Sequence, residues 1–144
     1  TYAHFHGFNI ELIKANEGTT DKASMDERLE RGGIAGVIVQ QPNYYGIVED
    51  YSGFADSCHA NKALFVINSV AADLAMLKTP GEWDADIAVG DGQSLGIPMS
   101  FGVGVPGVYY EKEKLVAEMF GFPQFWCDGR SDNGKFGYYL RIVS

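Results

Sequence analysis

The stretch GQSLG (residues 92–96) follows the apolar run DIAV (86–89) and matches the G-x-S-x-G pattern of serine hydrolases. In those enzymes a strained turn from strand to helix exposes the serine nucleophile, which here would be Ser94. The pattern needs a helix directly after the serine and a histidine later in the chain. Pro98 opposes a helix that begins at Ser94, and all three histidines precede it. We therefore interpret this stretch as a tight turn at the carboxyl end of a strand.

Two other patterns invite a chemical interpretation. GVGVPG (102–107) matches the glycine pattern of dinucleotide-binding loops, but Pro106 interrupts it and a strand-like VYY follows instead of a helix. His59, an H-x-H pair near the N-terminus, and the acidic pair Asp84 and Asp86 have the chemistry of metal ligands. No spacing among them places two ligands on one helical face. We predict neither a nucleotide site nor a metal site.

The stretch QQPNYYG (40–46) follows a predicted buried strand, where open α/β sheets place their ligand-binding loops. Pro42 and Asn43 favour a defined turn. Tyr44 and Tyr45 are aromatic side chains that suit the lining of a pocket. An ordinary connection whose tyrosines only pack against the protein is the open alternative.

Four apolar runs predict the strands that would position these loops: residues 8–13, 35–40, 63–69 and 85–89. Helical features occupy the segments 21–33, 50–62 and 71–81. The first of these has Asp21 as a candidate N-cap, Met25 and Leu29 on one face, and a stop at Gly32 and Gly33. The second places Phe54 and Cys58 on one face.

The last three runs are almost continuously apolar, which is typical of parallel strands covered by helices on both faces. After residue 100 we predict a strand at 107–110, a short helix at 111–120, a loop at 121–137 and a final strand at 137–143. These last strands suit an antiparallel edge. We expect one α/β domain over residues 1–144, with a mostly parallel sheet, a βαβ core at 1–102 and a divergent strand-helix-strand tail at 103–144.

Composition excludes several classes of function. Hydrophobic residues make up 46% and charged residues 21% of the 144 residues, as in ordinary globular proteins. The net charge of −8 and the dispersed cations argue against nucleic acid or an anionic membrane as partner. No apolar run approaches the roughly 18 residues that span a bilayer. Cys58 and Cys127 match no C-x-x-C motif, so we predict reduced thiols in a cytoplasmic protein.

Long stretches of the chain resemble one enzyme family: TYAHFHGF, VIVQQPNYYGIVED, ALFVINS and LKTPGEWDADIAVGDGQSLGIPMSFG. They are similar to the first subunit of glycine dehydrogenase (decarboxylating), the P-protein of the glycine cleavage system, over residues 1–102. The resemblance implies part of the large domain of a pyridoxal-phosphate (PLP) transferase of fold type I. It also implies glycine decarboxylation, with transfer of the aminomethyl group to the lipoyl arm of the H-protein. In the two-subunit versions, a second homologous chain carries PLP.

This resemblance gives GQSLG another meaning. In the cofactor-bearing homologue the turn after this strand carries the Schiff-base lysine, and the aligned position here is Gln93, whose amide cannot form a Schiff base. Ser69 and Val70 stand where such enzymes place an aspartate against the pyridine nitrogen. We therefore expect a chain that holds no cofactor covalently, is inactive alone and contributes contacts to a PLP-bearing second subunit. The candidate contact residues are Asn43, Tyr44, Gln93 and Ser94.

The chain also departs from the family pattern. The family continues from SFG into a GGP-type loop, whereas this chain reads SFGVGVPGVYY, and family members extend beyond both ends of this sequence. Exposed sheet edges would follow, so we expect self-association into a homo-oligomer, a partner chain, or an edge rebuilt from residues 103–144. Two alternatives stay open: a stand-alone α/β module that binds a small anion through backbone N–H groups of its glycine-rich turns, or a purely structural assembly domain.

Overall fold

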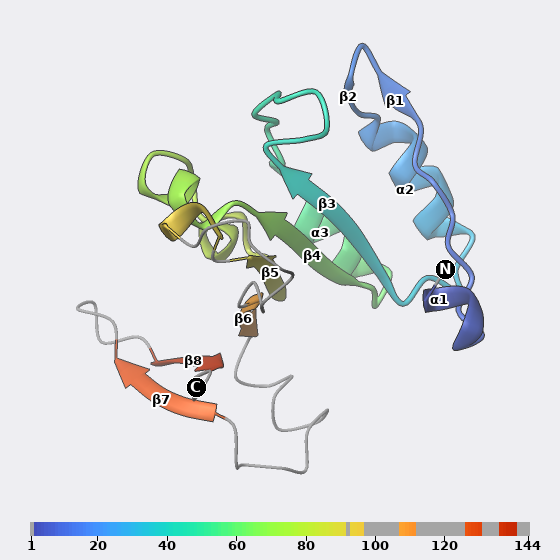
Figure 1. The fold of residues 1–144 in the computed structure, drawn as a ribbon. Helices are drawn as coiled ribbons and strands as arrows, with labels where there is room; N and C mark the ends of the chain where they lie inside the picture. The colour runs from blue at the N-terminus through green and yellow to red at the C-terminus, as the bar shows by residue number, and fades with distance from the viewer. Residues whose placement is uncertain (1, 92, 97–106, 112–125, 131–135, 141–144) are drawn as a thin grey trace.

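The computed structural model describes residues 2–91, 93–96, 107–111, 126–130 and 136–140 (Figure 1). Its main sheet has the strand order β3-β4-β5-β6. The strands are β3 (Gly36–Gln41), β4 (Leu64–Ser69), β5 (Ile87–Asp91) and β6 (Gly107–Glu111). The first three are parallel, and β6 pairs antiparallel with β5. This confirms the prediction of a mostly parallel sheet with an antiparallel edge.

Two helices, α2 (Lys22–Glu30) and α3 (Phe54–Ala60), pack on one face of the sheet. The residues that the helical spacing predicts to be buried, Met25 and Leu29 on α2 and Phe54 and Cys58 on α3, are buried, and Ala55 on α3 is buried as well. Figure 1 shows α3 behind β3 and β4. The helices meet the inward side chains of the two strands, Val37, Val39, Phe65 and Ile67, in one core.

The opposite face of β3 and β4 is less covered, which corrects the expectation of helices on both faces. Burial alternates along both strands, and Ile38 is 70% exposed. The connections between the parallel strands explain why one face is less covered. The parallel strands follow one another in order across the sheet, so their right-handed crossovers lie on the same side. Trp83, in the second crossover, accordingly packs against the same core as α3.

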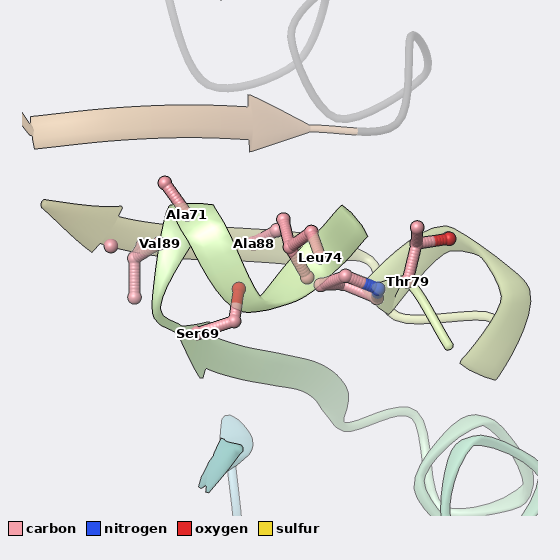
Figure 2. Close-up of a pocket in the computed structure, with 9 residues that line it drawn as sticks. Ser69, Ala71, Leu74, Thr79, Ala88 and Val89 are labelled. Carbon is pink, nitrogen blue, oxygen red and sulfur yellow. The ribbon is translucent and has the colours of Figure 1, made fainter. Parts of the chain in front are cut away.

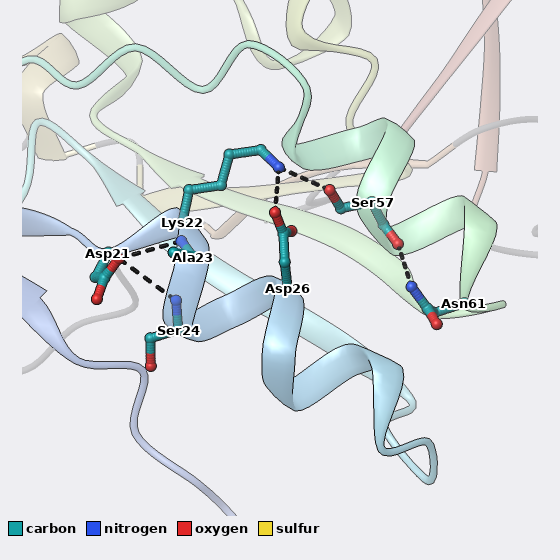
Figure 3. A network of polar contacts seen from close by, with 7 residues as sticks. All are labelled: Asp21, Lys22, Ala23, Ser24, Asp26, Ser57 and Asn61. Carbon is teal, nitrogen blue, oxygen red and sulfur yellow. Dashed lines mark hydrogen bonds and ion pairs between the residues drawn. The ribbon is translucent and has the colours of Figure 1, made fainter.

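The ends of α2 are set by the predicted signals. The Asp21 carboxylate accepts hydrogen bonds from the N–H groups of Ala23 (3.1 Å) and Ser24 (3.4 Å), as an N-cap does. Lys22 then joins the two helices, because its Nζ donates to Asp26 Oδ2 (2.7 Å) and to Ser57 Oγ (2.8 Å) on α3 (Figure 3).

The remaining elements are short. They comprise α1 (Tyr2–Phe5), the hairpin of β1 (Ala15–Asn16) and β2 (Thr19–Thr20), and the 3-10 turns η1 (Ala71–Ala75), η2 (Pro80–Trp83) and η3 (Gln93–Leu95). A further hairpin pairs β7 (Trp126–Arg130) with β8 (Phe136–Leu140). No helix among the described residues is long and apolar enough to cross a membrane.

Three local predictions need correction. Residues 8–13 form no strand, because no strand among the described residues pairs with them, and the segment is instead tied to α2 by an ion pair between Glu11 and Arg28. The predicted helix at 71–81 is divided between η1 and η2, since Pro80 cannot continue a helix and starts a new turn. Strand β7 lies inside the predicted loop at 121–137. The predicted helix at 111–120 lies almost wholly outside the described residues.

Candidate functional site at the carboxyl edge of the sheet

A cavity of about 290 Å³ lies between the ends of β4 and β5 and the turns η1 and η2 (Figure 2). Crevices at the carboxyl ends of parallel strands are the usual ligand sites of open α/β sheets. The lining residues are small or apolar: Ser69, Ala71, Leu74, Thr79, Pro80, Gly81, Ala88, Val89 and Gly90. None of the described residues that line it is ionisable.

Gly90 allows the two strands to approach closely beside the cavity. A Cβ atom built on Gly90 would lie 2.2 Å from the carbonyl oxygen of Ser69. The Ser69 oxygen is a backbone atom and a Cβ is bonded directly to the Cα, so no side-chain rotation relieves the contact. The glycine is therefore required by the approach of β5 to the end of β4.

The turn after β5 holds two of the predicted contact residues. Ser94 Oγ accepts a hydrogen bond from the Ala72 N–H (3.1 Å), which links η3 to the first turn of η1. Gln93 is half-buried in the same turn. The Ser94 hydroxyl thus holds the start of η1 against η3. This is a structural role and not that of a nucleophile.

The other side of the cavity is held by a capping box at the start of η2. The Glu82 carboxylate accepts hydrogen bonds from the Thr79 N–H (2.8 Å) and hydroxyl (2.9 Å), and Thr79 Oγ accepts one from the Glu82 N–H (3.4 Å). The bonds from Thr79 lower the pKa of Glu82. This reciprocal pair fixes the segment 79–81 against the cavity.

Asn43, in the loop after β3, uses all its hydrogen-bonding positions within the protein. Its Oδ1 accepts from the N–H groups of Tyr45 (2.9 Å) and Ile47 (3.0 Å). Its Nδ2 donates to the Gly18 carbonyl (2.7 Å) and to Glu49 Oε1 (2.8 Å). An amide offers two donors and one oxygen with two lone pairs, so none is left for a ligand. Asn43 therefore organises the loop.

The loop that Asn43 organises presents Tyr44 to solvent. Tyr44 is 91% exposed and stacks edge-to-face with Tyr45, with ring centroids 5.3 Å apart. The pair lies at the carboxyl end of β3, and β4 lies between that strand and the cavity-lining β5. The structure thus places the four predicted residues at the same edge of the sheet, but in two groups on either side of β4.

Two residues that sequence reasoning missed, Gln41 and Glu49, hold this loop from inside. The Gln41 side chain donates to the Glu49 carbonyl (2.9 Å) and accepts from its N–H (3.1 Å). The buried Glu49 carboxylate also accepts from the Thr20 N–H (2.6 Å) of β2. The sequence signal that could have found Glu49 is its position, because it is the first charged residue after the uncharged stretch 32–48.

Three of the residues with metal-ligand chemistry, His59, Asp84 and Asp86, come together at the opposite edge of the sheet. His59 Nε2 lies 2.8 Å from Asp86 Oδ2, and His59 Nδ1 lies 3.9 Å from Asp84 Oδ2. Asp86 also accepts the Phe65 N–H (2.8 Å) at the start of β4. Within the described part of the chain, no three metal-ligating side chains form a cluster suited to an ion. The geometry favours a link between α3 and the sheet.

The cavity as described does not fit PLP. The lining residue Ser69 is neutral, and the turn after β5 carries Gln93, whose amide cannot form a Schiff base with the cofactor's aldehyde. Lys78 is nearby in sequence, but its Nζ lies 3.5 Å from the centroid of the Trp83 ring, in a cation–π contact. The arrangement suits the packing of apolar groups more than the binding of a charged cofactor.

Comparison with known proteins agrees with this sheet. Residues 1–137 match the family model described as glycine cleavage system P-protein. A probable glycine dehydrogenase (decarboxylating) subunit 1 from Desulforamulus reducens is 41% identical over 121 residues, covering 84% of this chain and 27% of the relative. The corresponding protein of Listeria welshimeri is 37% identical over 142 residues, covering 99% of this chain and 31% of the relative.

A solved structure of similar fold is a crystal structure of glycine decarboxylase (P-protein) of the glycine cleavage system in inhibitor-bound form. It is 33% identical with a TM-score of 0.68, covering 98% of this chain and 31% of that chain. This confirms the expected fold, part of a PLP-transferase large domain. The matches extend beyond residue 102, the point to which the sequence motifs carried the resemblance. The chain spans less than a third of the length of the two relatives and the structure named here. It belongs to the glycine cleavage system P-protein family.

Proposed function

We propose that this chain serves glycine decarboxylation as part of the P-protein subunit that does not anchor PLP, and that it is inactive alone. The observation that carries the proposal is Gln93, in the turn after β5 where the family resemblance places the lysine. An amide lacks the amine that the cofactor's aldehyde requires. The neutral Ser69 at the end of the neighbouring β4 supports the same proposal.

In this proposal the chain completes the active site of a PLP-bearing second subunit. PLP, held by that subunit, supplies the electron sink for decarboxylation, and the lipoyl arm of the H-protein receives the aminomethyl group. Tyr44, Gln93 and Ser94 are the proposed contacts to the partner subunit's site, because they lie at the carboxyl edge of the sheet. Asn43 acts through the loop that it positions. We also propose a single α/β domain, with its core within residues 1–102, and a cytoplasmic location.

Borohydride trapping tests this proposal directly. The purified chain is incubated with PLP, reduced and examined by peptide mass spectrometry for a pyridoxyl lysine. We expect no stoichiometric adduct. The Lys78→Arg variant is the matched control, because Lys78 is the lysine nearest to the cavity in sequence and its replacement keeps the charge over Trp83. A single stoichiometric adduct that disappears in Lys78→Arg would overturn the proposal.

The alternative of a small-anion-binding module has less support. Anion sites need N–H donors or cations that converge on one point, and no ionisable side chain lines the cavity beside β5 among the described residues. A second hollow of about 370 Å³ beside β2 includes the carboxylates of Glu49 and Asp50, which repel anions, and one cation, Lys22, which is already paired with Asp26. Titration with inorganic phosphate, followed by amide chemical shifts of Ser94 and Gly96, would favour the alternative if those shifts saturate at millimolar phosphate.

A further inference from the structure

The tip of the β1–β2 hairpin contacts the loop of residues 42–48, which follows β3 (Figure 1). The Gly18 carbonyl accepts a hydrogen bond from Asn43 Nδ2 (2.7 Å). A Cβ atom built on Gly18 would lie 3.2 Å from Ile47 Cδ1 and 3.5 Å from a ring carbon of Tyr45, so the tip packs against both side chains. Each strand of the hairpin has two residues, and such a hairpin is marginally stable by itself. Contacts with the rest of the chain must therefore hold it in place.

Glu49 joins the hairpin to the loop through both oxygens of its carboxylate. Its Oε2 accepts a hydrogen bond from the Thr20 N–H (2.6 Å) in β2, and its Oε1 accepts one from Asn43 Nδ2 (2.8 Å) in the loop. The Thr20 hydroxyl also donates to Oε1 (3.3 Å). The backbone of Glu49 is fixed in turn by the side chain of Gln41, the last residue of β3. The carboxylate thus connects both segments to the end of the sheet.

A carboxylate is an expensive group to bury at this position. Glu49 is 8% exposed, and it takes part in none of the ion pairs among the described residues. Hydrogen bonds alone therefore compensate for the hydration that the charge loses. An apolar side chain would fill the same space without that cost. The presence of the charge indicates a role that packing alone does not serve.

The donors that meet this carboxylate cannot be satisfied by an amide. The Thr20 N–H belongs to the backbone, and Asn43 cannot reverse its amide, because its Oδ1 accepts the N–H groups of Tyr45 (2.9 Å) and Ile47 (3.0 Å). In Glu49→Gln only one side-chain oxygen remains. One of the two N–H donors then faces the new NH2 group, although the volume of the side chain is almost unchanged.

We propose that Glu49 is a positioning residue, which fixes the β1–β2 hairpin to the loop and thereby sets the place of Tyr44 at the carboxyl edge of the sheet. The connection runs from Glu49 to Asn43, whose Oδ1 holds the Tyr45 N–H, and the Tyr45 ring stacks against that of Tyr44. The value of this position for the reaction rests on the proposed function, in which Tyr44 contacts the partner subunit's site. The connection itself does not.

Amide hydrogen exchange, followed by NMR on the whole chain, tests the connection in Glu49→Gln. The Thr20 N–H reports the hairpin, the Ile47 N–H reports the loop, and the Leu64 N–H reports opening of the sheet. We expect the Thr20 or the Ile47 N–H, whichever donor loses its acceptor, to exchange about tenfold faster relative to the Leu64 N–H. A general loss of stability would instead accelerate all three together.

Asp50→Asn is the matched control, because it removes the neighbouring negative charge and keeps an oxygen for both donors from Ser52, which share Asp50 Oδ1. We expect it to leave the relative exchange rates unchanged. Rescue provides the second comparison. In the double variant Asn43→Asp/Glu49→Gln, the new amide donates to the new carboxylate and its oxygen accepts the Thr20 N–H. Asn43→Asp alone places two carboxylates together, so we expect slower exchange in the double variant than in Asn43→Asp.

Decarboxylation of glycine by this chain mixed with the PLP-bearing second subunit and the H-protein separates the two proposals. We expect Glu49→Gln and Tyr44→Ala each to lower kcat/KM, and the double variant to lose no more than Tyr44→Ala alone, because Glu49 acts through Tyr44. Losses that add in full would overturn the role of Glu49 towards Tyr44. An inactive wild-type mixture would contradict the proposed function, while the exchange rates would still decide whether Glu49 connects the hairpin to the loop.

Three exchange results would overturn the connection: a rise at Thr20 and Ile47 no larger than at Leu64, the same rise in Asp50→Asn, or a double variant that exchanges no more slowly than Asn43→Asp. If Glu49→Gln does not fold, a folded double variant supports the connection and an unfolded one overturns it.

Discussion

Replacing Gly90 with alanine tests whether the close approach of β5 to β4 holds the cavity together. The new Cβ would lie 2.2 Å from the Ser69 carbonyl oxygen, and real Cβ atoms essentially never come within 3.0 Å of a heavy atom. The strands must therefore separate by roughly 0.8 Å at this point, the difference between those two distances. Because the Cβ position and the Ser69 oxygen are both fixed by the backbone, the movement strains the pairing of β4 with β5.

The size of the destabilisation follows from the kind of steric clash. Overpacking of a well-packed region costs about 1–3 kcal/mol. We expect Gly90→Ala to lower the free energy of unfolding by an amount near the upper end of this range, about 3 kcal/mol, because no flexible side chain can move out of the way. Gly81→Ala is the matched control, since its Cβ meets no heavy atom within 4 Å and its φ is not positive. A substitution of that kind changes stability by about 0.5 kcal/mol or less.

Urea denaturation of the wild-type chain and both variants measures these differences. The midpoint of Gly90→Ala should fall while the slope stays the same, which reports a change in stability and not in the unfolded state. The midpoint of Gly81→Ala should stay close to the wild type. If the two alanine variants unfold together, the backbone contact between Gly90 and Ser69 is not the constraint that we describe.

Two further predictions concern titratable groups. Burial, then the charges of Asp86 and Asp26, raise the pKa of Cys58 to about 11, so the thiol is almost wholly protonated at pH 8. Iodoacetamide should therefore label the Cys58 peptide only in urea, and equal labelling of the native chain would contradict its burial. For Glu82, hydrogen bonds from Thr79 lower the pKa below 4.5. The stability that the ionised carboxylate contributes is therefore present above pH 4.5 and is lost as the pH falls through the lowered pKa. An NMR titration should give a midpoint below 4.5 that returns towards 4.5 in Thr79→Ala, and an unchanged midpoint would show that Thr79 is not the cause.

The sequence predicted the elements whose signals are local. The strands β3, β4 and β5 appear as apolar runs, and the paired apolar positions of α2 and α3 are buried as their spacing indicates. Residues 8–13 carry an equally strong strand pattern, yet they form no strand. A strand forms only when a neighbouring strand pairs with its backbone N–H and C=O groups, and the sequence of the segment alone does not specify that neighbour.

The candidate site shows the same difference between features with a local sequence signal and features that depend on distant parts of the chain. The turn at QQPNYYG was predictable from Pro42 and Asn43, but the four hydrogen bonds of Asn43 depend on Gly18 and Glu49, which come from other parts of the chain. The requirement for Gly90 was not visible in GDGQSLG, because it arises from a carbonyl on another strand. Predictions from sequence reach the loop and the turn, whereas contacts between them require the fold.

Two neutral residues, Ser69 in the cavity lining and Gln93 in the turn after β5, support the proposed function more strongly together than either does alone. A PLP site of this fold needs an amine after β5 and an acid at the end of β4, on adjacent strands of one sheet. This chain has the amide of Gln93 in the turn after β5 and the hydroxyl of Ser69 at the end of β4. Restoring a lysine at Gln93 would place an amine beside a cavity with no ionisable lining among the described residues, so the charge on a bound pyridine ring would lack a partner. The proposed loss of cofactor anchoring therefore belongs to the cavity as a whole and is not reversed by one substitution.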